Sequence, residues 1–137
     1  YEEYIESKMQ IFAHQSEKGI VILNQDNTIT RELAKKAKGE VVWFSSKNRL
    51  EDGYMYEEGV IKICKEGLRK HVISTKDVIL RGIHNYENIC TAMAATASLV
   101  SLENQIKVDG IVAVSAGVLF GVNYLSNQKG RVIRYNN

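Results

Sequence analysis

Proline is absent from the 137 residues, and neither sign of charge is in large excess. Without proline the sequence lacks the residues that most clearly mark element boundaries. The net charge of +2 comes from 18 basic and 16 acidic residues, which is too balanced to indicate a nucleic-acid-binding surface. The densest basic patch, Lys35, Lys36 and Lys38, is better explained as a solvated helix end. We therefore expect no nucleic-acid partner.

Cysteines are few, and long apolar runs are missing. Cys64 and Cys90 provide neither a disulfide framework nor the spacing of a metal site, so we expect a reducing compartment and two buried thiols. The longest apolar-rich stretch, Val108 to Val122, has 15 residues, whereas a membrane helix needs about 20. Tyr1 to Lys8 contain three glutamates and no apolar signal-peptide core. These observations predict a soluble, cytoplasmic protein without a membrane partner.

The composition itself is that of an ordinary globular domain, with 45% hydrophobic and 25% charged residues. In the first half, short continuous apolar runs alternate with helical patterns, which is typical of a parallel βαβ unit. Residues 24–28 have turn and N-cap chemistry, which predicts that a helix starts after them. Gly39 is expected at the C′ position of that helix. The elements predicted here are a helix over 1–15, a strand over 19–23, a helix over 29–38 and a strand over 41–44.

The second half changes character, because short strands are separated by turns that each end in glycine. This pattern predicts a small antiparallel meander, followed by a long alanine-rich helix whose inner face carries Ile89, Ala92 or Met93, Thr96, and Leu99 or Val100. The predicted strands are 54–56, 60–63, 68–73 and, as a further candidate, 77–80. The predicted helices are 85–102 and 105–119, and 131–135 is a last strand.

Lys8 is the first candidate for chemistry, because helical spacing places it on one face with Tyr4 and Phe12. One interpretation is an amphipathic lysine whose stem covers apolar surface while its ammonium group reaches water. The other is a partly buried lysine that is available for covalent modification or for a metal–phosphate site.

The second candidate is the pair Asn85 and Asn88 at the start of the long helix. Asn85 suits an N-cap, with Asn88 three residues further on over the same face. Alternatively, the two carboxamides, each with donors and an acceptor, read the edge of a heterocycle such as adenine. His84 is expected to be a structural partner rather than a base.

Two segments resemble a known family. "YEEYIESKMQIFAHQ" followed by "VILNQDNTITRELA" is similar to the central domain of the Mur ligases, which carry a Tyr-x-x-x-Lys-x-x-Ile-Phe pattern and then a Leu-Asn-x-Asp-Asp turn. "GIHNYENICTAMAAT" resembles the Gly-x-His-Asn-x-x-Asn helix start of the same family. The resemblance covers about residues 1–103 and is greatest to the D-glutamate-adding branch. It implies an α/β fold, namely the second half of a central ATP-binding domain with a parallel sheet and a small antiparallel meander.

The resemblance also implies an activity. Such enzymes use ATP to join D-glutamate to UDP-N-acetylmuramoyl-L-alanine in peptidoglycan synthesis. Lys8 corresponds to the family lysine that is carbamylated, has a catalytic role and helps to hold Mg²⁺, an ion that prefers oxygen ligands. Asn85 and Asn88 correspond to residues that contact adenine. If these roles carry over, all three residues flank one nucleotide–metal pocket.

The sequence also departs from the family pattern. It contains no Gly-x-x-x-x-Gly-Lys-Ser/Thr loop to hold phosphates, so we expect the isolated chain to be inactive. We assign residues 1–103 to the C-terminal half of the central domain and residues 104–137 to a divergent segment at the entry to the C-terminal ligase domain. The alternative is a truncated or decayed relative that acts as a non-catalytic binding or oligomerising module, because a half-sheet leaves an edge open to self-association.

Overall fold

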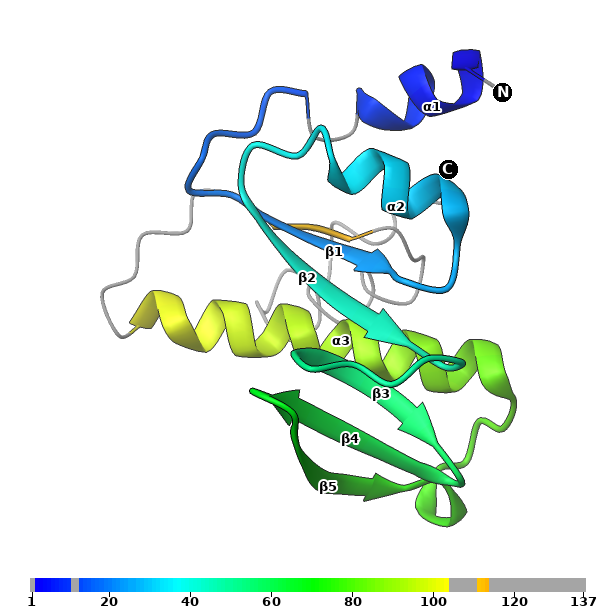
Figure 1. Cartoon of the computed structure of the whole chain (residues 1–137). Coiled ribbons are helices and arrows are strands. Elements are labelled where there is room, and N and C mark those ends of the chain that lie inside the picture. The colour runs from blue at the N-terminus through cyan, green and yellow to red at the C-terminus, as the bar shows by residue number, and fades with distance from the viewer. Residues whose placement is uncertain (1, 11–12, 104–110, 114–137) are drawn as a thin grey trace, which may run out of the picture.

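The computed structural model describes residues 2–10, 13–103 and 111–113. Its centre is a six-stranded mixed sheet with the strand order β5-β4-β3-β2-β1-β6 (Figure 1). The strands are β1 (Ile20–Asn24), β2 (Glu40–Ser45), β3 (Gly53–Glu57), β4 (Val60–Lys65), β5 (Leu68–Ser74) and β6 (Ile111–Ala113). The helices are α1 (Glu2–Met9), α2 (Thr28–Ala34), the 3₁₀ turn η1 (Thr75–Asp77) and α3 (Ile83–Glu103). Among the helices of these described ranges, none has the length and apolar character needed to cross a bilayer.

The predicted βαβ unit is confirmed. β1 and β2 pair in parallel, with Ile20 opposite Glu40 and Asn24 opposite Phe44. α2 connects them and begins at the predicted cap, where the Asn27 Oδ1 accepts a hydrogen bond from the Ile29 N–H at 2.8 Å. This bond satisfies one of the N–H groups that a helix start leaves without an intrahelical partner.

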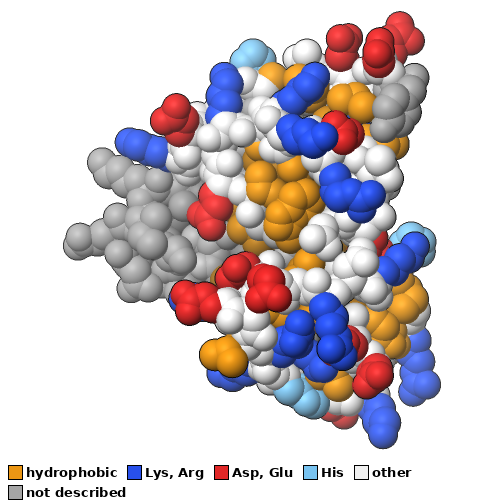
Figure 2. Space-filling model, in the orientation of Figure 1, with side chains coloured by type: hydrophobic (Ala, Val, Ile, Leu, Met, Phe, Trp, Pro, Cys, Tyr) orange, Lys and Arg blue, Asp and Glu red, His pale blue; other side chains and the backbone are white. Residues whose placement is uncertain are grey.

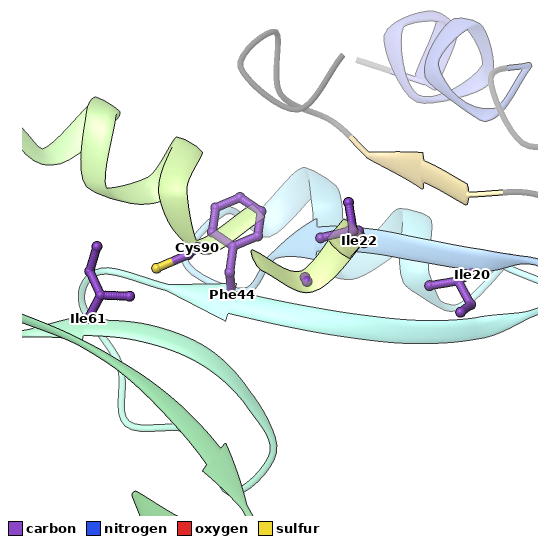
Figure 3. Packing of buried hydrophobic residues seen from close by; sticks show 7 residues of the cluster. Ile20, Ile22, Phe44, Ile61 and Cys90 are labelled. Carbon is purple, nitrogen blue, oxygen red and sulfur yellow. The ribbon is translucent and has the colours of Figure 1, made fainter. Parts of the chain in front are cut away.

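The side chains of β1 alternate between the two faces of the sheet, as a strand requires. Ile20 and Ile22 belong to a core cluster with α3, in which Phe44 lies beside Cys90 (Figure 3). Val21 and Leu23 belong to a second cluster with Leu33 of α2, and Ile5 and Met9 of α1 pack against it. All four β1 residues are less than a tenth exposed. The sheet is therefore covered by α3 on one face and by α1 and α2 on the other.

The antiparallel meander is also confirmed, since β3 pairs with β4 and β4 with β5 in antiparallel register. The sequence did not indicate that it continues the parallel sheet. β3 starts beside the end of β2, with Phe44 opposite Tyr54 and Ser45 opposite Met55. Gly53 permits this junction: its φ is 134°, and a Cβ atom there would lie 2.3 Å from the Trp43 carbonyl oxygen.

Two helix boundaries differ from the prediction. The first helix ends at Met9 rather than at residue 15, and Ser16 to Gly19 form a turn into β1, with the Gly19 N–H donating to the Ser16 carbonyl at 3.0 Å. α2 ends at Ala34 with Lys35 as its C-cap, so the expectation of Gly39 at C′ is wrong. Gly39 instead allows a close approach of β1 and β2, because a Cβ there would lie 2.0 Å from the Gly19 carbonyl oxygen.

Two predicted elements are wrong. Residues 77–80 form no strand: β5 ends at Ser74, η1 follows it, and Ile79 is 95% exposed and pairs with none of the described strands. The helix expected over 105–119 is contradicted at Ile111–Ala113, where β-branched residues pair in parallel with β1. The rest of that helix and the strand over 131–135 lie outside the described residues.

α3 starts at Ile83, two residues before the predicted start. Its most buried residues are Cys90, Thr91, Ala94, Ala95 and Ser98. Ile89 and Met93 are partly buried beside them, so the predicted inner face is close to the true one but rotated. Both cysteines are free thiols and buried as expected, and burial raises the pKa of Cys90 to about 12.

Candidate functional site

A polar cluster lies where β1 and β2 end. In α/β sheets, ligands bind at the carboxyl ends of parallel strands, so this edge is the first place to look for a site. The Asn24 side chain accepts a hydrogen bond from the Asp26 N–H at 2.8 Å, which folds the chain into an Asx turn directly after β1. Thr30 of α2 donates to the Asn24 carbonyl, which fixes this turn against the helix start.

Asp26 is the centre of the cluster. Its carboxylate accepts hydrogen bonds from Ser45 Oγ at 2.5 Å, from the Ser46 N–H at 2.8 Å and from Asn48 Nδ2 at 2.8 Å. Burial by itself raises the pKa of Asp26, but the hydrogen bonds from Ser45, Ser46 and Asn48 outweigh it, and the net pKa is lowered. Asp26 is therefore a fixed anion that holds the end of β1 to the turn after β2.

Ser45 organises that turn. It is 1% exposed, and its Oγ accepts hydrogen bonds from the Asn48 N–H at 2.7 Å and from the Lys47 N–H at 3.1 Å while it donates to Asp26. All the polar capacity of this hydroxyl is thereby used. The turn 45–48 thus has a shape fixed by side chains rather than by strand pairing.

The cluster reaches across to α3. Ser46 Oγ donates to Glu87 Oε1 at 2.6 Å, although the two residues are 41 positions apart in sequence. Glu87 Oε2 lies 3.7 Å from Nδ1 of His84, whose side chain is fully exposed. The first turns of α3 therefore lie at the carboxyl edge of the parallel strands.

Asn85 and Asn88 are placed on this part of α3, and both are partly buried. The prediction that Asn85 is the N-cap is wrong, because the helix begins at Ile83 and Asn85 lies within its first turn. Asn85 Nδ2 instead donates to the Arg81 carbonyl at 2.8 Å, which ties the helix to the segment before it. Within the first turn, the Asn85 and Tyr86 N–H groups donate to the Gly82 carbonyl, which closes the start of the helix.

Lys8 lies elsewhere. It is partly buried in the last turn of α1, which packs on the α2 side of the sheet, whereas α3 covers the opposite side (Figure 1). The structure therefore brings Asn85 and Asn88 near Asp26 but separates Lys8 from them by the buried layer of β1 and β2. The expectation that Phe12 shares a face with Lys8 concerns a residue outside those described.

Neither of two hollows that are lined by described residues has Lys8, Asn85 or Asn88 in its lining. One lies against β2 and is lined by residues that include Trp43, Gly53 and Tyr54. The other is apolar, lies between α3 and the meander, and is lined by Ile89, Met93 and others. Neither of these hollows therefore brings Lys8 together with Asn85 and Asn88.

The described residues offer few ligands for a magnesium ion. Within residues 2–10, 13–103 and 111–113, no group of three or more His, Cys, Asp or Glu side chains is arranged to hold a metal. A carbamylated Lys8 would offer one carboxylate-like group, whereas Mg²⁺ is usually held by one or two carboxylates together with waters and substrate phosphates. The described residues therefore do not complete a magnesium site by themselves.

Sequence reasoning did not single out Asp26, Ser46 or Glu87. The local signal for Asp26 was the Asn-x-Asp sequence directly after a buried strand, which was interpreted only as turn and cap chemistry. Its partners Ser45, Ser46 and Asn48 are 19 to 22 residues away, so no local pattern could connect them.

Comparison with known proteins gives a consistent family. Residues 1–96 match the Mur ligase middle domain. The chain is similar to proteins named UDP-N-acetylmuramoylalanine–D-glutamate ligase. That of Clostridium beijerinckii is 39% identical over 107 residues, or 78% of this chain and 22% of the relative. That of Acetivibrio thermocellus is 39% identical over 99 residues, or 72% and 21%.

A third relative of the same name, from Alkaliphilus oremlandii, is 34% identical over 139 residues, covering 94% of this chain and 30% of the relative. The chain thus spans less than a third of the length of these three relatives. The match covers α1, the parallel βαβ unit, the meander and most of α3. This chain therefore belongs to the Mur ligase family, as part of its middle domain.

Proposed function

We propose that this chain is the adenine-contacting part of an ATP-dependent ligase that joins D-glutamate to UDP-N-acetylmuramoyl-L-alanine in peptidoglycan synthesis. The observation that carries the proposal is the position of Asn85 and Asn88 on the first turns of α3, beside the polar cluster at the carboxyl edge of β1 and β2. The substrate assignment is supported by the names of the relatives, each of which is a D-glutamate ligase.

In this proposal the two carboxamides read the adenine edge. A carboxamide offers two N–H donors and one oxygen acceptor, which match the acceptor and donor nitrogens of adenine. One donor of Asn85 is engaged with the Arg81 carbonyl, and this bond orients the group. Orientation before binding lowers the entropy cost of recognition, so the Asn85 bond to the backbone supports the adenine contact.

Lys8 keeps its proposed role as a carbamylated lysine that ligates Mg²⁺ in the full-length protein. The ion neutralises phosphate charge when it is bound. In this proposal the carbamate of Lys8 would be one ligand of the ion, and waters and substrate phosphates would be others. We also propose that residues 1–103 form the C-terminal half of the central domain and that residues 104–137 lead into the C-terminal ligase domain.

The activity is tested in a full-length ligase that carries this segment. We expect phosphate release from ATP only when UDP-N-acetylmuramoyl-L-alanine and D-glutamate are both present. Asn85→Ala and Asn88→Ala should each raise the KM for ATP about tenfold, since losing a hydrogen bond worth about 1.4 kcal/mol changes affinity by that factor. Lys70→Ala, exposed on β5, is the control and should leave the KM unchanged. Phosphate release that does not depend on D-glutamate would reject the substrate assignment.

The 137-residue chain alone is expected to be inactive and to bind MgATP only weakly, because its sequence contains no phosphate-holding glycine-rich loop. Isothermal titration calorimetry with MgATP measures this directly. Submillimolar affinity would contradict the expectation and would show that α3 and its surroundings suffice for binding.

A second candidate function, a non-catalytic oligomerising module, is supported by one observation. β5 is the edge strand of the sheet, and its Leu68 and Val72 are 78% and 41% exposed. An open edge with apolar side chains favours pairing with another chain, although Arg69, Lys70 and His71 on the same strand oppose it. Figure 2 shows a further apolar area in the middle of the face that it displays, bordered by charged side chains. A monodisperse monomer in light scattering would count against this function.

A further inference from the structure

The contact between Ser46 and Glu87 has a geometry that capping alone does not require. An acidic residue in the first turns of a helix is stabilised by the helix dipole without any hydrogen bond to another element. Glu87 instead accepts a short hydrogen bond of 2.6 Å from a hydroxyl on a different element, and its side chain is only 18% exposed. The bond therefore joins the first turns of α3 to the turn that follows β2.

Ser46 is itself held in place. Its backbone N–H donates to Asp26 Oδ2 at 2.8 Å, and its Oγ lies 3.3 Å from the same oxygen. A hydroxyl has one proton, and the shorter distance of 2.6 Å assigns that proton to Glu87. Ser46 thus connects a fixed anion at the end of β1 to a carboxylate on α3.

Glu87 lies between Asn85 and Asn88 in sequence, within the same two turns of helix. We propose that Glu87 is a positioning residue for nucleobase recognition: through Ser46, which Asp26 anchors, it sets where Asn85 and Asn88 lie relative to the carboxyl edge of the sheet. This inference rests on the proposed function, because it concerns the adenine contact made by those two asparagines. It assigns no contact between Glu87 and the nucleotide.

The experiment uses a full-length ligase that carries this segment and compares two pairs of variants. Glu87→Ala and Ser46→Ala remove the acceptor or the donor of the connecting hydrogen bond. Glu87→Gln and Ser46→Thr keep an acceptor or a hydroxyl at the same place and serve as matched controls. For each variant we measure the KM for ATP, the KM for D-glutamate, kcat, and the preference for ATP over GTP as a ratio of kcat/KM values.

We expect both alanine variants to raise the KM for ATP about five- to tenfold and to reduce the preference for ATP by a similar factor, as loss of one hydrogen bond of ordinary strength implies. The KM for D-glutamate and kcat at saturating ATP should stay within about twofold, as should all values for Glu87→Gln and Ser46→Thr. The double alanine variant should be no worse than either single one, because both remove the same interaction. A general loss of stability would not change nucleobase preference.

Three outcomes overturn the inference. They are an unchanged KM for ATP in both alanine variants, an unchanged preference for ATP over GTP, and additive effects in the double variant. If Glu87→Ala does not fold, Ser46→Ala decides, since it removes a single oxygen atom. Asn85→Ala and Asn88→Ala separate the two proposals: if they leave the KM for ATP unchanged, the proposed adenine contact fails, whereas if they raise it and Ser46→Ala does not, only the positioning role fails.

Discussion

Two carboxylates in this molecule, Asp26 and Glu57, are held in contrasting ways. Asp26, after β1, accepts hydrogen bonds from neutral donors, namely the Ser45 hydroxyl, the Asn48 carboxamide and the Ser46 backbone N–H. Glu57, at the end of β3, is paired with two cations, Lys62 Nζ at 2.8 Å and Arg49 Nε at 2.7 Å. Hydrogen bonds from Lys62 and Arg49 lower the pKa of Glu57 to about 2.

The difference distinguishes the carboxyl edge of β1 and β2 from the meander. Neutral donors must be placed within hydrogen-bond distance and in the right direction, so the Asp26 cluster fixes the geometry of three elements at once. An ion pair tolerates a wider range of geometries, and one at the surface contributes little to stability. The meander is held mainly by its antiparallel backbone ladder, whereas the carboxyl edge depends on individual side chains.

Gly53→Ala is expected to cause the largest loss of stability, because Gly53 lies where the meander joins β2. Its φ of 134° costs a non-glycine residue about 1–3 kcal/mol. A Cβ lying 2.3 Å from the Trp43 carbonyl oxygen adds about 1–3 kcal/mol of overpacking. We expect a loss of about 2–6 kcal/mol, measured by urea denaturation with the single tryptophan, Trp43, as the fluorescent probe.

Gly82→Ala is the control for that prediction. Gly82 also has a positive φ, 111°, but a Cβ there would meet nothing within 4 Å. It should therefore show the backbone strain without the collision, at about 1–3 kcal/mol. Equal losses in the two variants would mean that the close approach of β2 and β3 at Gly53 has no energetic consequence.

The next effect comes from Asp26→Ala, which leaves Ser45, Ser46 and Asn48 without their common acceptor. Buried or partly buried donors without an acceptor cost about 1–3 kcal/mol each, offset where water replaces the lost partner. We expect the free energy of unfolding to fall by about 2–4 kcal/mol, measured by the same denaturation. Asp77→Ala, at an exposed position in η1, removes the same side chain as a control. A similar loss in both variants would show that the Asp26 cluster has no special role.

The fold was predictable where a local pattern determined it. Gly19 to Leu23 and Val41 to Phe44 are continuous apolar runs, and both are strands of a parallel pair. The turns that end in glycine correctly predicted the antiparallel meander. The apolar residues at Ile79 and Leu80 misled, because hydrophobicity alone does not show whether a neighbouring strand is present to pair with. For Ile111–Ala113 the error was the reverse: a helix was predicted, but these residues pair in parallel with β1 and form a strand.

The site was predictable only in part. Residues 24–28 were assigned turn and N-cap chemistry, and the cap is Asn27; this was predictable because capping acts over two or three residues. The connection from Asp26 through Ser46 to Glu87 spans residues 20 and 41 positions apart, and only the folded chain brings them together. The roles of Lys8, Asn85 and Asn88 came from resemblance and stay predictions. The structure adds that Lys8 lies on the opposite face from the two asparagines.

The pH dependence of stability distinguishes Glu57 from Asp26, with a smaller expected change in stability than in the variants above. Folding lowers the pKa of Glu57 from its ordinary value of 4.5 to about 2, so its ion pairs stabilise the fold above pH 4.5, and this stabilisation is lost as the pH falls toward 2. The pKa of Asp26 is also lowered, from 3.8, so its contribution is lost only below that pH. Urea midpoints at pH 6, 4.5, 3.5 and 2.5 should fall less steeply below pH 4.5 in Glu57→Gln than in the unchanged chain.

Asp26→Asn provides the comparison for that titration. Its urea midpoint should change with pH differently from that of the unchanged chain only below pH 3.8. If Glu57→Gln and the unchanged chain lose stability in parallel through this range, the ion pairs do not stabilise the fold.

Arg49→Ala is expected to cause the smallest loss of stability. It tests whether the exposed ion pair of Glu57 contributes to the fold. The Arg49 side chain is 69% exposed, and Glu57 keeps Lys62, whose side chain is 23% exposed, as its second partner. Since 1 M salt shortens the screening length to about 3 Å, an exposed pair loses most of its attraction there. We expect a small decrease in the urea midpoint at low salt that disappears in 1 M NaCl, while the loss in Asp26→Ala persists at both salt concentrations. A salt-independent loss in Arg49→Ala would mean that the arginine acts by packing its stem, and the contrast between the ion-paired Glu57 and the hydrogen-bonded Asp26 would then fail.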